Sequence, residues 1–356
     1  MSTPFAFAPG QRPFVIAEMS GNHKGELGRA IRLIDAAKDA GADAVKIQTY
    51  TADTITLDCD RPEFRIGGGL WEGRTLHDLY REAHTPWEWH EAMFAHAARI
   101  GIPLFSSPFD PTAVDLLERL GAPAYKIASF EIVDTPLIRY AARTGKPMII
   151  STGMAGLGEI AEAVAAVREG GTGQAERGEL ALLHCNSGYP SPPEDINLRT
   201  IPHLAQAFGV PAGLSDHTHG IAVPVAAVAV GAVIIEKHMT LDRSEGGVDA
   251  DFSLEPAEFK AMVEACRVAH AALGGIDYTL SPSEAGGRAF RRSLYVTEAV
   301  RAGEVLDGRN VRSIRPGRGL PPRHLPEVLG RRATRDLERG EPLDWSMVGP
   351  AGRNPA

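Results

Sequence analysis

The chain has 356 residues, 44% hydrophobic and 23% charged, a composition typical of a globular α/β protein and not of a disordered, collagen-like or coiled-coil chain. Its longest apolar run, 221–235, is interrupted by Pro224 and Gly231 and is shorter than the roughly 18 residues that cross a bilayer. Residues 1–13 lack the pattern of a secretory signal, and the three cysteines are far apart without C-x-x-C spacing. We therefore expect a cytoplasmic protein without a membrane span, disulfide framework or zinc ribbon.

The net charge of −8 is unevenly distributed. Residues 281–356 contain 14 Arg, no Lys and 9 acidic residues, a balance of +5, so residues 1–280 carry −13. This change of sign predicts a domain boundary near residue 280. The arginines are interleaved with acids and lack aromatic stacking partners, so we expect no nucleic-acid binding. An acidic small-molecule substrate or a subunit contact is favoured instead.

Short β-branched apolar runs alternate with longer helical patterns through residues 1–280, which is typical of repeated βα units. Strands are predicted at 14–19, 44–49, 102–106, 124–128, 147–151, 180–185, 212–215 and 232–237. Helices are predicted between them, as at 27–40, 111–120, 156–169 and 221–230, and a last helix at 256–273. Eight repeats in about 250 residues predict a (β/α)8 barrel, with a doubly wound parallel sheet as the alternative.

Two regions depart from this repeat. Residues 51–85 predict a long loop that follows the second strand and lies over the barrel mouth, where long loops are usually functional. After residue 281, short alternating strands at 293–296 and 311–314 with Gly- and Pro-rich turns predict a small β-rich domain. The predicted organisation is a catalytic barrel at 1–280, a linker at 281–288 and a C-terminal domain at 289–350.

All eight predicted strands end in polar residues, at the position where a (β/α)8 barrel carries its reacting groups. Lys46 and Lys126 stand among apolar strand residues, and a buried ammonium group requires an anionic partner because its desolvation is costly. That partner is either a structural carboxylate, from Glu18 or Glu131, or the phosphate and carboxylate of a substrate. Neutral donors for such a substrate are available at neighbouring strand ends, in Ser107, Ser129 and Ser151, and Gln48 shares a strand face with Lys46.

Two histidines, His217 and His238, stand at the ends of neighbouring predicted strands. An isolated histidine is more often a structural residue. Two imidazoles that converge beside oxygen ligands are typical of a site for Mn²⁺, Zn²⁺ or a similar ion. The sequence therefore predicts a divalent-metal site next to the lysines.

Taken together, the strand-end motifs resemble those of the sialic acid synthase family, in order along nearly the whole chain. The motifs are Ile16-Ala17-Glu18, Asn22-His23, Lys46-Ile47-Gln48-Thr49, Ser107-Pro108-Phe109, Lys126-Ile127-Ala128-Ser129, Ser151-Thr152-Gly153-Met154, Ser215-Asp216-His217-Thr218 and Glu236-Lys237-His238. The C-terminal part, with Arg315-Pro316-Gly317, is similar to the small antifreeze-like (SAF) domain of that family. The segment from Leu70 to His90 is most similar to the pseudaminic acid synthase branch.

The resemblance implies a reaction as well as a fold. It implies the condensation of phosphoenolpyruvate with the open-chain aldehyde of an acetamido sugar, which gives a nine-carbon 2-keto acid and phosphate. In the pseudaminic branch the sugar is 2,4-diacetamido-2,4,6-trideoxy-altrose and the product is pseudaminic acid.

The resemblance also implies roles for individual residues. His217 and His238 would hold a metal that activates the aldehyde, Mn²⁺ in first place and Mg²⁺, Co²⁺ or Zn²⁺ as alternatives. Glu18 and Glu131 are the candidates for proton transfer, together with the two histidines as catalytic residues. Phosphoenolpyruvate would be bound by Lys46, Gln48, Ser107, Lys126, Ser129 and Ser151. The sugar would be bound by Asn22, Tyr189, Asp249 and Arg315, the last donated by the partner in a domain-swapped homodimer.

Two departures from the family pattern leave the metal and phosphate motifs intact. Residues 186–190 differ from the family's Cys-Thr-x-x-Tyr-Pro pattern at its Thr, and Met239 stands where many members have Phe. Three alternatives stay open: an N-acetylneuraminate or legionaminic acid synthase that uses a mannosamine-type sugar, a Schiff-base aldolase with Lys126 or Lys46 as nucleophile, and a non-catalytic sugar-binding protein. The motifs do not determine the sugar, because its recognition depends on loop geometry.

Overall fold

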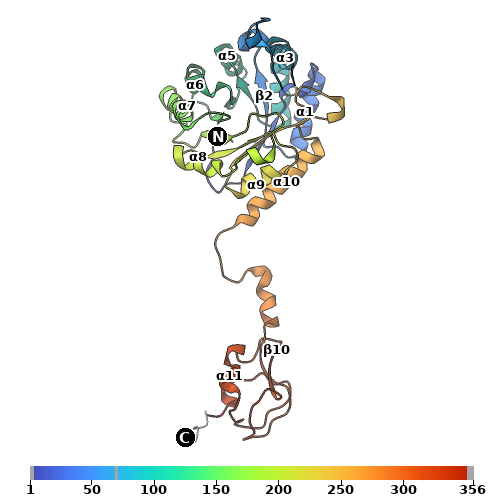
Figure 1. Cartoon of the computed structure of the whole chain (residues 1–356), viewed down its shortest axis with the longest axis vertical. Helices are drawn as coiled ribbons and strands as arrows, with labels where there is room; N and C mark the ends of the chain where they lie inside the picture. Colours follow the sequence, from blue (N-terminus) through green and yellow to red (C-terminus); the bar gives the residue numbers. More distant parts are fainter. Residues whose placement is uncertain (1–3, 69–70, 351–356) are drawn as a thin grey trace. The chain divides into compact units, whose positions relative to one another are not determined.

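A computed structural model describes residues 4–68 and 71–350 (Figure 1). The chain divides into two compact units, Met1–Gly274 and Gly275–Ala356. In the first unit, eight parallel strands form a closed barrel in sequence order. The strands are β1 (Phe14–Glu18), β2 (Ala44–Thr49), β3 (Leu104–Pro108), β4 (Tyr125–Ile127), β5 (Met148–Ser151), β6 (Leu180–His184), β7 (Ala212–Asp216) and β8 (Ile234–His238). The predicted (β/α)8 barrel is confirmed, and the open doubly wound sheet is excluded because β1 pairs with β8.

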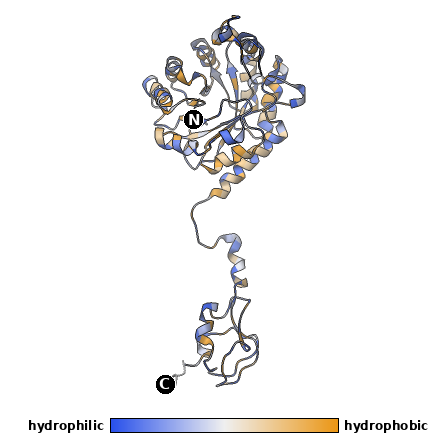
Figure 2. Ribbon diagram, viewed as in Figure 1, coloured by the Kyte–Doolittle hydropathy of each residue, from blue (hydrophilic) through white to orange (hydrophobic). Residues whose placement is uncertain are grey.

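Helices surround this barrel (Figure 1). They are α1 (Leu27–Asp39), α2 (Ala52–Ile55), α3 (Leu76–Ala83), α4 (His90–Ile100), α5 (Pro111–Arg119), α6 (Thr135–Ala142), α7 (Leu157–Gly170), α8 (Thr200–Phe208), α9 (Ala222–Ala229) and α10 (Pro256–Leu273). Apolar and polar residues alternate around the same helices (Figure 2), as expected for helices that pack one face on a sheet. In the described part of the chain, no helix is both long and apolar enough to cross a membrane.

Side-chain alternation divides each strand between the barrel interior and the helix layer. In β1, Val15 and Ala17 join the large apolar cluster under the helices, whereas Ile16 joins a separate cluster inside the barrel. Phe5, from the segment before β1, closes this inner cluster through ring contacts with Phe14 and Phe105, at centroid distances of 5.3 and 5.0 Å. The barrel therefore has an apolar floor, and the inward positions above it are free to carry polar groups.

The predicted loop at 51–85 contains secondary structure, so that prediction was wrong in this respect. The segment contains α2 and α3, and an antiparallel bridge pairs Arg65 with Thr75, the residue before α3. The Thr75 side chain caps α3 by accepting a hydrogen bond from the N–H of Asp78 at 3.1 Å. Helices of four and eight residues have too few turns for a helical hydrophobic period to be recognised in the sequence. Leu70, the first residue of the segment similar to the pseudaminic branch, lies outside the described residues.

The second unit is the small β-rich domain that the sequence predicts. After a 3-10 helix, η7 (Pro282–Phe290), the antiparallel strands β9 (Ser293–Val296) and β10 (Val311–Ile314) occupy the predicted positions. A short helix, α11 (Leu325–Val328), completes the unit. Its own apolar core includes Leu294, Val296, Leu306, Val311, Val328 and Leu343.

Candidate active site

Polar side chains line the upper interior of the barrel, at the carboxyl ends of the strands. Alternate positions of one strand share a face, so residues two apart project inward together. The inward set comprises Glu18 of β1, Lys46 and Gln48 of β2, Ser107 of β3, Lys126 of β4, Ser151 of β5, Ser215 of β7 with the following His217, and Glu236 and His238 of β8. The strand ends that the sequence singles out therefore meet in one place.

The two lysines share one carboxylate. Nζ of Lys46 lies 3.1 Å from Oε1 of Glu236 and 3.1 Å from Oε2 of Glu18. Nζ of Lys126 lies 3.8 Å from the same Oε1 of Glu236. All four side chains are at most 5% exposed, so two positive and two negative charges compensate one another away from water. Glu236 is the anion at the centre of this network.

Sequence reasoning missed Glu236 as a site residue. It named Glu18 and Glu131 as carboxylate partners, and the Glu18 ion pair with Lys46 is present. The signal for Glu236 was available, because it stands two residues before His238 and therefore shares the inward face. Its Oε1 also accepts a hydrogen bond from Ser215 Oγ at 3.1 Å.

Burial and charge separate the pKa values in this network. Burial raises the pKa of Glu18, and the neighbouring Glu236 raises it further against the opposing effect of Lys46. For Glu236, Lys126 and Lys46 outweigh burial and lower the pKa. Burial lowers the pKa of Lys126 to about 8, whereas the two carboxylates outweigh burial at Lys46 and raise its pKa. Opposite shifts in adjacent carboxyl groups allow one to carry a proton while the other stays ionised.

The predicted hydroxyl donors have different partners. Nζ of Lys126 donates to Ser151 Oγ at 2.6 Å, and the Nζ of the other lysine lies 3.4 Å from Ser107 Oγ. Ser129 pairs with Ser187, with 2.9 Å between the two Oγ atoms. The hydroxyls of Ser107 and Ser151 are therefore within hydrogen-bond distance of the ammonium groups. Ser129 instead contacts Ser187 in the segment that follows β6.

Gln48 connects the lysine network to Asp249. Its Nε2 donates to Glu18 Oε1 and to Ser20 Oγ, both at 3.1 Å, and Ser20 Oγ donates to Asp249 Oδ2 at 2.5 Å. Ser20 was not predicted, yet it is a buried non-glycine residue with φ of 46°, in the left-handed region that costs about 1 kcal/mol or more. Hydrogen bonds of its side chain and main chain stabilise this conformation of Ser20, since its main-chain N–H also donates to Glu18 at 3.1 Å.

The other residues predicted to bind the sugar have distinct surroundings. The ring of Tyr189 lies 4.4 Å from that of His217, measured between centroids. Asn22 is fully buried, with Nδ2 donating to a main-chain carbonyl after β8 at 3.0 Å and to Ser253 Oγ at 2.8 Å. Its Oδ1 has no hydrogen-bond partner among the described residues. Arg315 is an exposed residue of the second unit, directly after β10.

The rings of His217 and His238 lie next to each other, with centroids 5.3 Å apart. Nδ1 of His217 donates to the carbonyl oxygen of Asn186 at 2.8 Å, which leaves Nε2 as the lone-pair donor. Nδ1 of His238 is buried and has no hydrogen-bond partner in the described part of the chain. Burial lowers the pKa of His217 to about 4 and that of His238 well below its ordinary value. Both rings are therefore neutral near pH 7, which is the form that binds a metal.

These two imidazoles fit a divalent metal ion. One has its second nitrogen held by a carbonyl, the usual arrangement behind a metal-binding histidine, and the other has a buried nitrogen without a partner. Within residues 4–68 and 71–350, no group of three or more His, Cys, Asp or Glu side chains is arranged to hold a metal. Substrate and water oxygens would have to complete the coordination, as in catalytic sites that keep open positions.

Glu131 lies beside the lysine network. It begins a 3-10 turn, η4 (Glu131–Val133), directly after β4, and its Oε2 is buried without a hydrogen-bond partner among the described residues. Burial raises its pKa to about 7, with Asp134 adding to the shift and Lys126 opposing it. Burial raises the pKa of Tyr80 in α3, and the charge of Glu131 raises it further. A carboxyl group that titrates near neutral pH is suited to acid or base catalysis.

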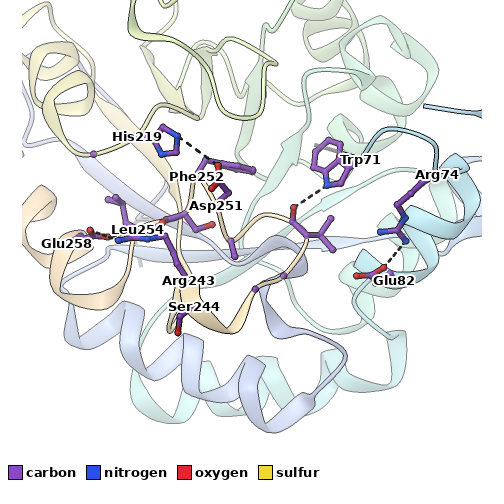
Figure 3. A pocket seen from close by; sticks show the side chains of 16 residues that line it. Trp71, Arg74, Glu82, His219, Arg243, Ser244, Asp251, Phe252, Leu254 and Glu258 are labelled. Carbon is purple, nitrogen blue, oxygen red and sulfur yellow. Dashed lines mark hydrogen bonds and ion pairs between the residues drawn. The ribbon is translucent and has the colours of Figure 1, made fainter. Parts of the chain in front are cut away.

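A cavity of about 940 Å³ opens between the 51–85 segment and the segment that joins β8 to α10 (Figure 3). The indole N–H of Trp71 donates across it to the carbonyl oxygen of Val248 at 3.2 Å. Aromatic rings lead from this cavity to the histidines: Trp71 lies 5.9 Å from Tyr189, Tyr189 5.4 Å from Phe252, and Phe252 4.9 Å from His238. The site therefore has a charged end at the lysine network and, at the mouth, an aromatic wall formed by Trp71, Tyr189 and Phe252.

The barrel, the buried lysine network and the paired imidazoles define a (β/α)8-barrel enzyme that acts on an anionic small molecule. Residues 33–278 match the NeuB family and residues 291–349 match the SAF domain. The chain belongs to the NeuB family.

Individual relatives narrow this comparison. A pseudaminic acid synthase of Campylobacter jejuni is 45% identical over 340 residues, covering 96% of this chain and 98% of the relative. A pseudaminic acid synthase of Helicobacter pylori is 42% identical over 334 residues, covering 94% and 97%. The crystal structure of the N-acetylneuraminic acid (sialic acid) synthetase of Leptospira borgpetersenii in complex with citrate matches with a TM-score of 0.69 and 32% identity, covering 79% of this chain and 92% of that one. The predicted family and its pseudaminic acid synthase branch are confirmed.

Replacing Glu131 by Gln should change how stability depends on pH. The folded state holds the Glu131 proton up to pH about 7, above the ordinary value of 4.5. The resulting stabilisation is complete below the unfolded-state pKa and is lost as the pH rises through the folded-state pKa. Between pH 4.5 and 7.5 the wild type should therefore lose about 3 kcal/mol of unfolding free energy relative to Glu131→Gln. Denaturant unfolding of both proteins across this range measures the difference, and parallel pH profiles would contradict it.

Proposed function

We propose that the protein condenses phosphoenolpyruvate with 2,4-diacetamido-2,4,6-trideoxy-altrose to give pseudaminic acid and phosphate. The C3 carbon of phosphoenolpyruvate forms the new bond to C1 of the open-chain aldehyde, water adds at C2, and the C2 phosphate leaves. The observation that carries the proposal is the convergence of two buried ammonium groups, Lys46 and Lys126, on Glu236 beside two neutral imidazoles. The similarity to pseudaminic acid synthases of C. jejuni and H. pylori supports this choice of sugar.

The lysine network is suited to the phosphate and carboxylate of phosphoenolpyruvate. In the absence of substrate, Glu18 and Glu236 neutralise the two ammonium groups. Because the pKa of Glu18 is raised, this carboxyl group can take up a proton when the anionic substrate enters, and Lys46 then pairs with the substrate. Neutral donors complete the binding site for phosphoenolpyruvate, from Gln48, Ser107, Ser129 and Ser151.

Proton transfer falls to Glu18, with Glu131 as the second candidate. Glu18 lies at the lysine network and, through Gln48 and Ser20, is linked to the proposed sugar-binding Asp249. A divalent ion on the two histidines, Mn²⁺ in first place and Mg²⁺, Co²⁺ or Zn²⁺ as alternatives, would act as a Lewis acid toward the aldehyde oxygen. The two histidines can bind such an ion because their lowered pKa values keep both imidazoles neutral.

The aromatic wall is suited to binding the less polar part of the proposed sugar. A 6-deoxy carbon and a second acetamido group make the altrose derivative less polar than N-acetylmannosamine. Trp71 and Tyr189 offer aromatic surface between the histidines and the cavity, and the buried Phe252 supports Tyr189. Asp249 and Asn22 would provide the polar contacts to the sugar.

We further propose a domain-swapped homodimer in which Arg315 enters the partner's site. The barrel part carries −13 and the C-terminal part +5, which favours docking between subunits. An apolar patch lies at the carboxyl ends of β4 and β5, where α7 packs against η4. Its members are Phe130, Val133, Met154 and Leu157, each more than half exposed. Such a patch beside a site is typical of a surface that a partner covers.

One observation favours a second function, a Schiff-base aldolase. The pKa of Lys126 near 8 is the kind of shift that activates a lysine nucleophile. Borohydride reduction with pyruvate separates the two reactions, because an aldolase leaves a covalent adduct on the lysine. We expect mass spectrometry to find no adduct.

Substrate preference tests the proposed reaction directly. With Mn²⁺ and phosphoenolpyruvate, the protein should release phosphate with 2,4-diacetamido-2,4,6-trideoxy-altrose at a kcat/KM about 100-fold above that for N-acetylmannosamine, because the aromatic wall and the second acetamido group discriminate. A matched assay without sugar is the control for simple phosphatase activity. A kcat/KM for N-acetylmannosamine that equals or exceeds that of the altrose derivative would contradict the assignment, and sugar binding without phosphate release would indicate a non-catalytic sugar-binding protein.

The metal site is tested by His217→Ala and His238→Ala. Each should abolish Mn²⁺ binding, measured by the electron paramagnetic resonance of free Mn²⁺, and lower kcat by several orders of magnitude because the aldehyde loses its activation. His203→Ala, at an exposed position of α8, is the matched control and should bind Mn²⁺ as the wild type does. Full activity of metal-stripped wild type in the presence of chelator would overturn the metal requirement.

The homodimer is tested by mixing two inactive chains, Arg315→Ala and Lys126→Ala. If Arg315 acts in the partner's site, each heterodimer combines both lesions in one site and leaves the other intact, so activity should return on mixing. Absence of recovery, with heterodimers confirmed by native mass spectrometry, would show that Arg315 does not act across subunits.

A further inference from the structure

A charged pair lies on the outer side of the barrel directly behind the histidines. Asp216 and Lys237 are register partners in β7 and β8 and alternate with Ser215 and Glu236, which face the interior. The outward position before Lys237, Ile235, belongs to the apolar layer under the helices. Asp216 and Lys237 both have 0% side-chain exposure, so the pair interrupts an otherwise apolar layer that α9 covers.

All side-chain polar atoms of Asp216 and Lys237 form hydrogen bonds with Thr218, in the turn that follows β7. Nζ of Lys237 lies 2.6 Å from Oδ2 of Asp216 and also donates to the carbonyl oxygen of Thr218. The carboxylate of Asp216 accepts from the N–H of Thr218 at 3.2 Å and from its hydroxyl at 3.0 Å. The main-chain donor and acceptor of Thr218 are therefore both held by the ion pair.

The residue enclosed by this turn is His217, which stands between Asp216 and Thr218, and His238 directly follows Lys237. One ion pair thus determines the backbone on both sides of the first histidine and immediately before the second. The outer side of the barrel contributes this support, whereas the carbonyl of Asn186, in the segment after β6, orients the His217 ring.

Stability does not explain such a pair. A buried ion pair is often no more stabilising than apolar side chains of the same volume, because both charges are removed from water. Its distinctive property is direction, since charged hydrogen bonds fix angles and distances that apolar contacts leave loose. A catalytic pair of ligands on two separate strands needs that direction.

We propose that Asp216 and Lys237 are positioning residues that lock the ends of β7 and β8 and so set the separation and orientation of the two metal-binding imidazoles. This proposal rests on the proposed metal site of His217 and His238. Both side chains lie on the outer side of the barrel, and each acts through the backbone of the histidines.

The test is the double variant Asp216→Asn/Lys237→Met, which removes both charges together and keeps an amide oxygen for the Thr218 bonds. We expect the double variant to fold with a Tm close to wild type. It should bind Mn²⁺ about 10- to 100-fold more weakly and have a lower kcat. The KM for phosphoenolpyruvate should change less than about threefold, because none of the residues of the lysine network is substituted. The matched control is Glu118→Gln/Lys146→Met, which removes an ion pair of 2.6 Å formed beside the amino ends of β4 and β5. The control should keep wild-type Mn²⁺ affinity.

A second variant decides the question if the double variant does not fold. Thr218→Val deletes the hydroxyl that donates to Asp216 at nearly constant volume and leaves the ion pair in place. We expect Mn²⁺ binding to weaken about 3- to 10-fold at unchanged KM for phosphoenolpyruvate. Wild-type Mn²⁺ affinity and kcat in a folded double variant, or in Thr218→Val, would overturn the positioning role. If wild type itself binds no Mn²⁺, the proposed metal site fails, which is a separate outcome.

Discussion

Two ammonium groups buried inside a barrel impose the strongest constraint on this structure. Removing a lysine from water costs several kcal/mol unless an anion replaces the lost hydration, and the barrel interior holds Lys46 and Lys126 within reach of the same Glu236. The shared carboxylate keeps both charges inside. In the proposed function, the same arrangement would suit a substrate that carries two anionic groups, because the ammonium groups are already desolvated.

The barrel meets this constraint by dividing its interior into two levels. The lower level is apolar and is closed by Phe5 against Phe105, so water is excluded from below. The upper level is polar because the inward positions near the strand ends carry the lysines, carboxylates, hydroxyls and imidazoles. Strand alternation therefore separates the stabilising part of the barrel from its chemistry without a separate domain for either.

The pKa values in the upper level differ in ways that suit the reaction. Glu18 is shifted toward its protonated form and Glu236 toward its ionised form, although both are buried beside Lys46. Burial lowers the pKa of both histidines, and both are therefore neutral near pH 7. At His217 burial outweighs Asp216 and Glu236, whereas at His238 the neighbouring His217 and the lysines add to the effect of burial. A carboxyl group that can carry a proton, a permanent anion and two neutral nitrogen ligands therefore lie within one site, each in the protonation state that its proposed role requires.

The sequence alone determined the barrel, the two lysines, the paired histidines and the family, because these depend on local signals: period-two alternation in strands, helical spacing between them and motifs at strand ends. Only the tertiary structure decided which carboxylate the lysines share, since the Glu236 contact joins β8 to β2 and β4 across the barrel interior. The same holds for the link from Gln48 through Ser20 to Asp249, and for the ion pair of Asp216 and Lys237 behind the histidines. These contacts depend on strand register and barrel closure. Both are set by pairing between strands that are far apart in the sequence, so no local sequence pattern specifies them.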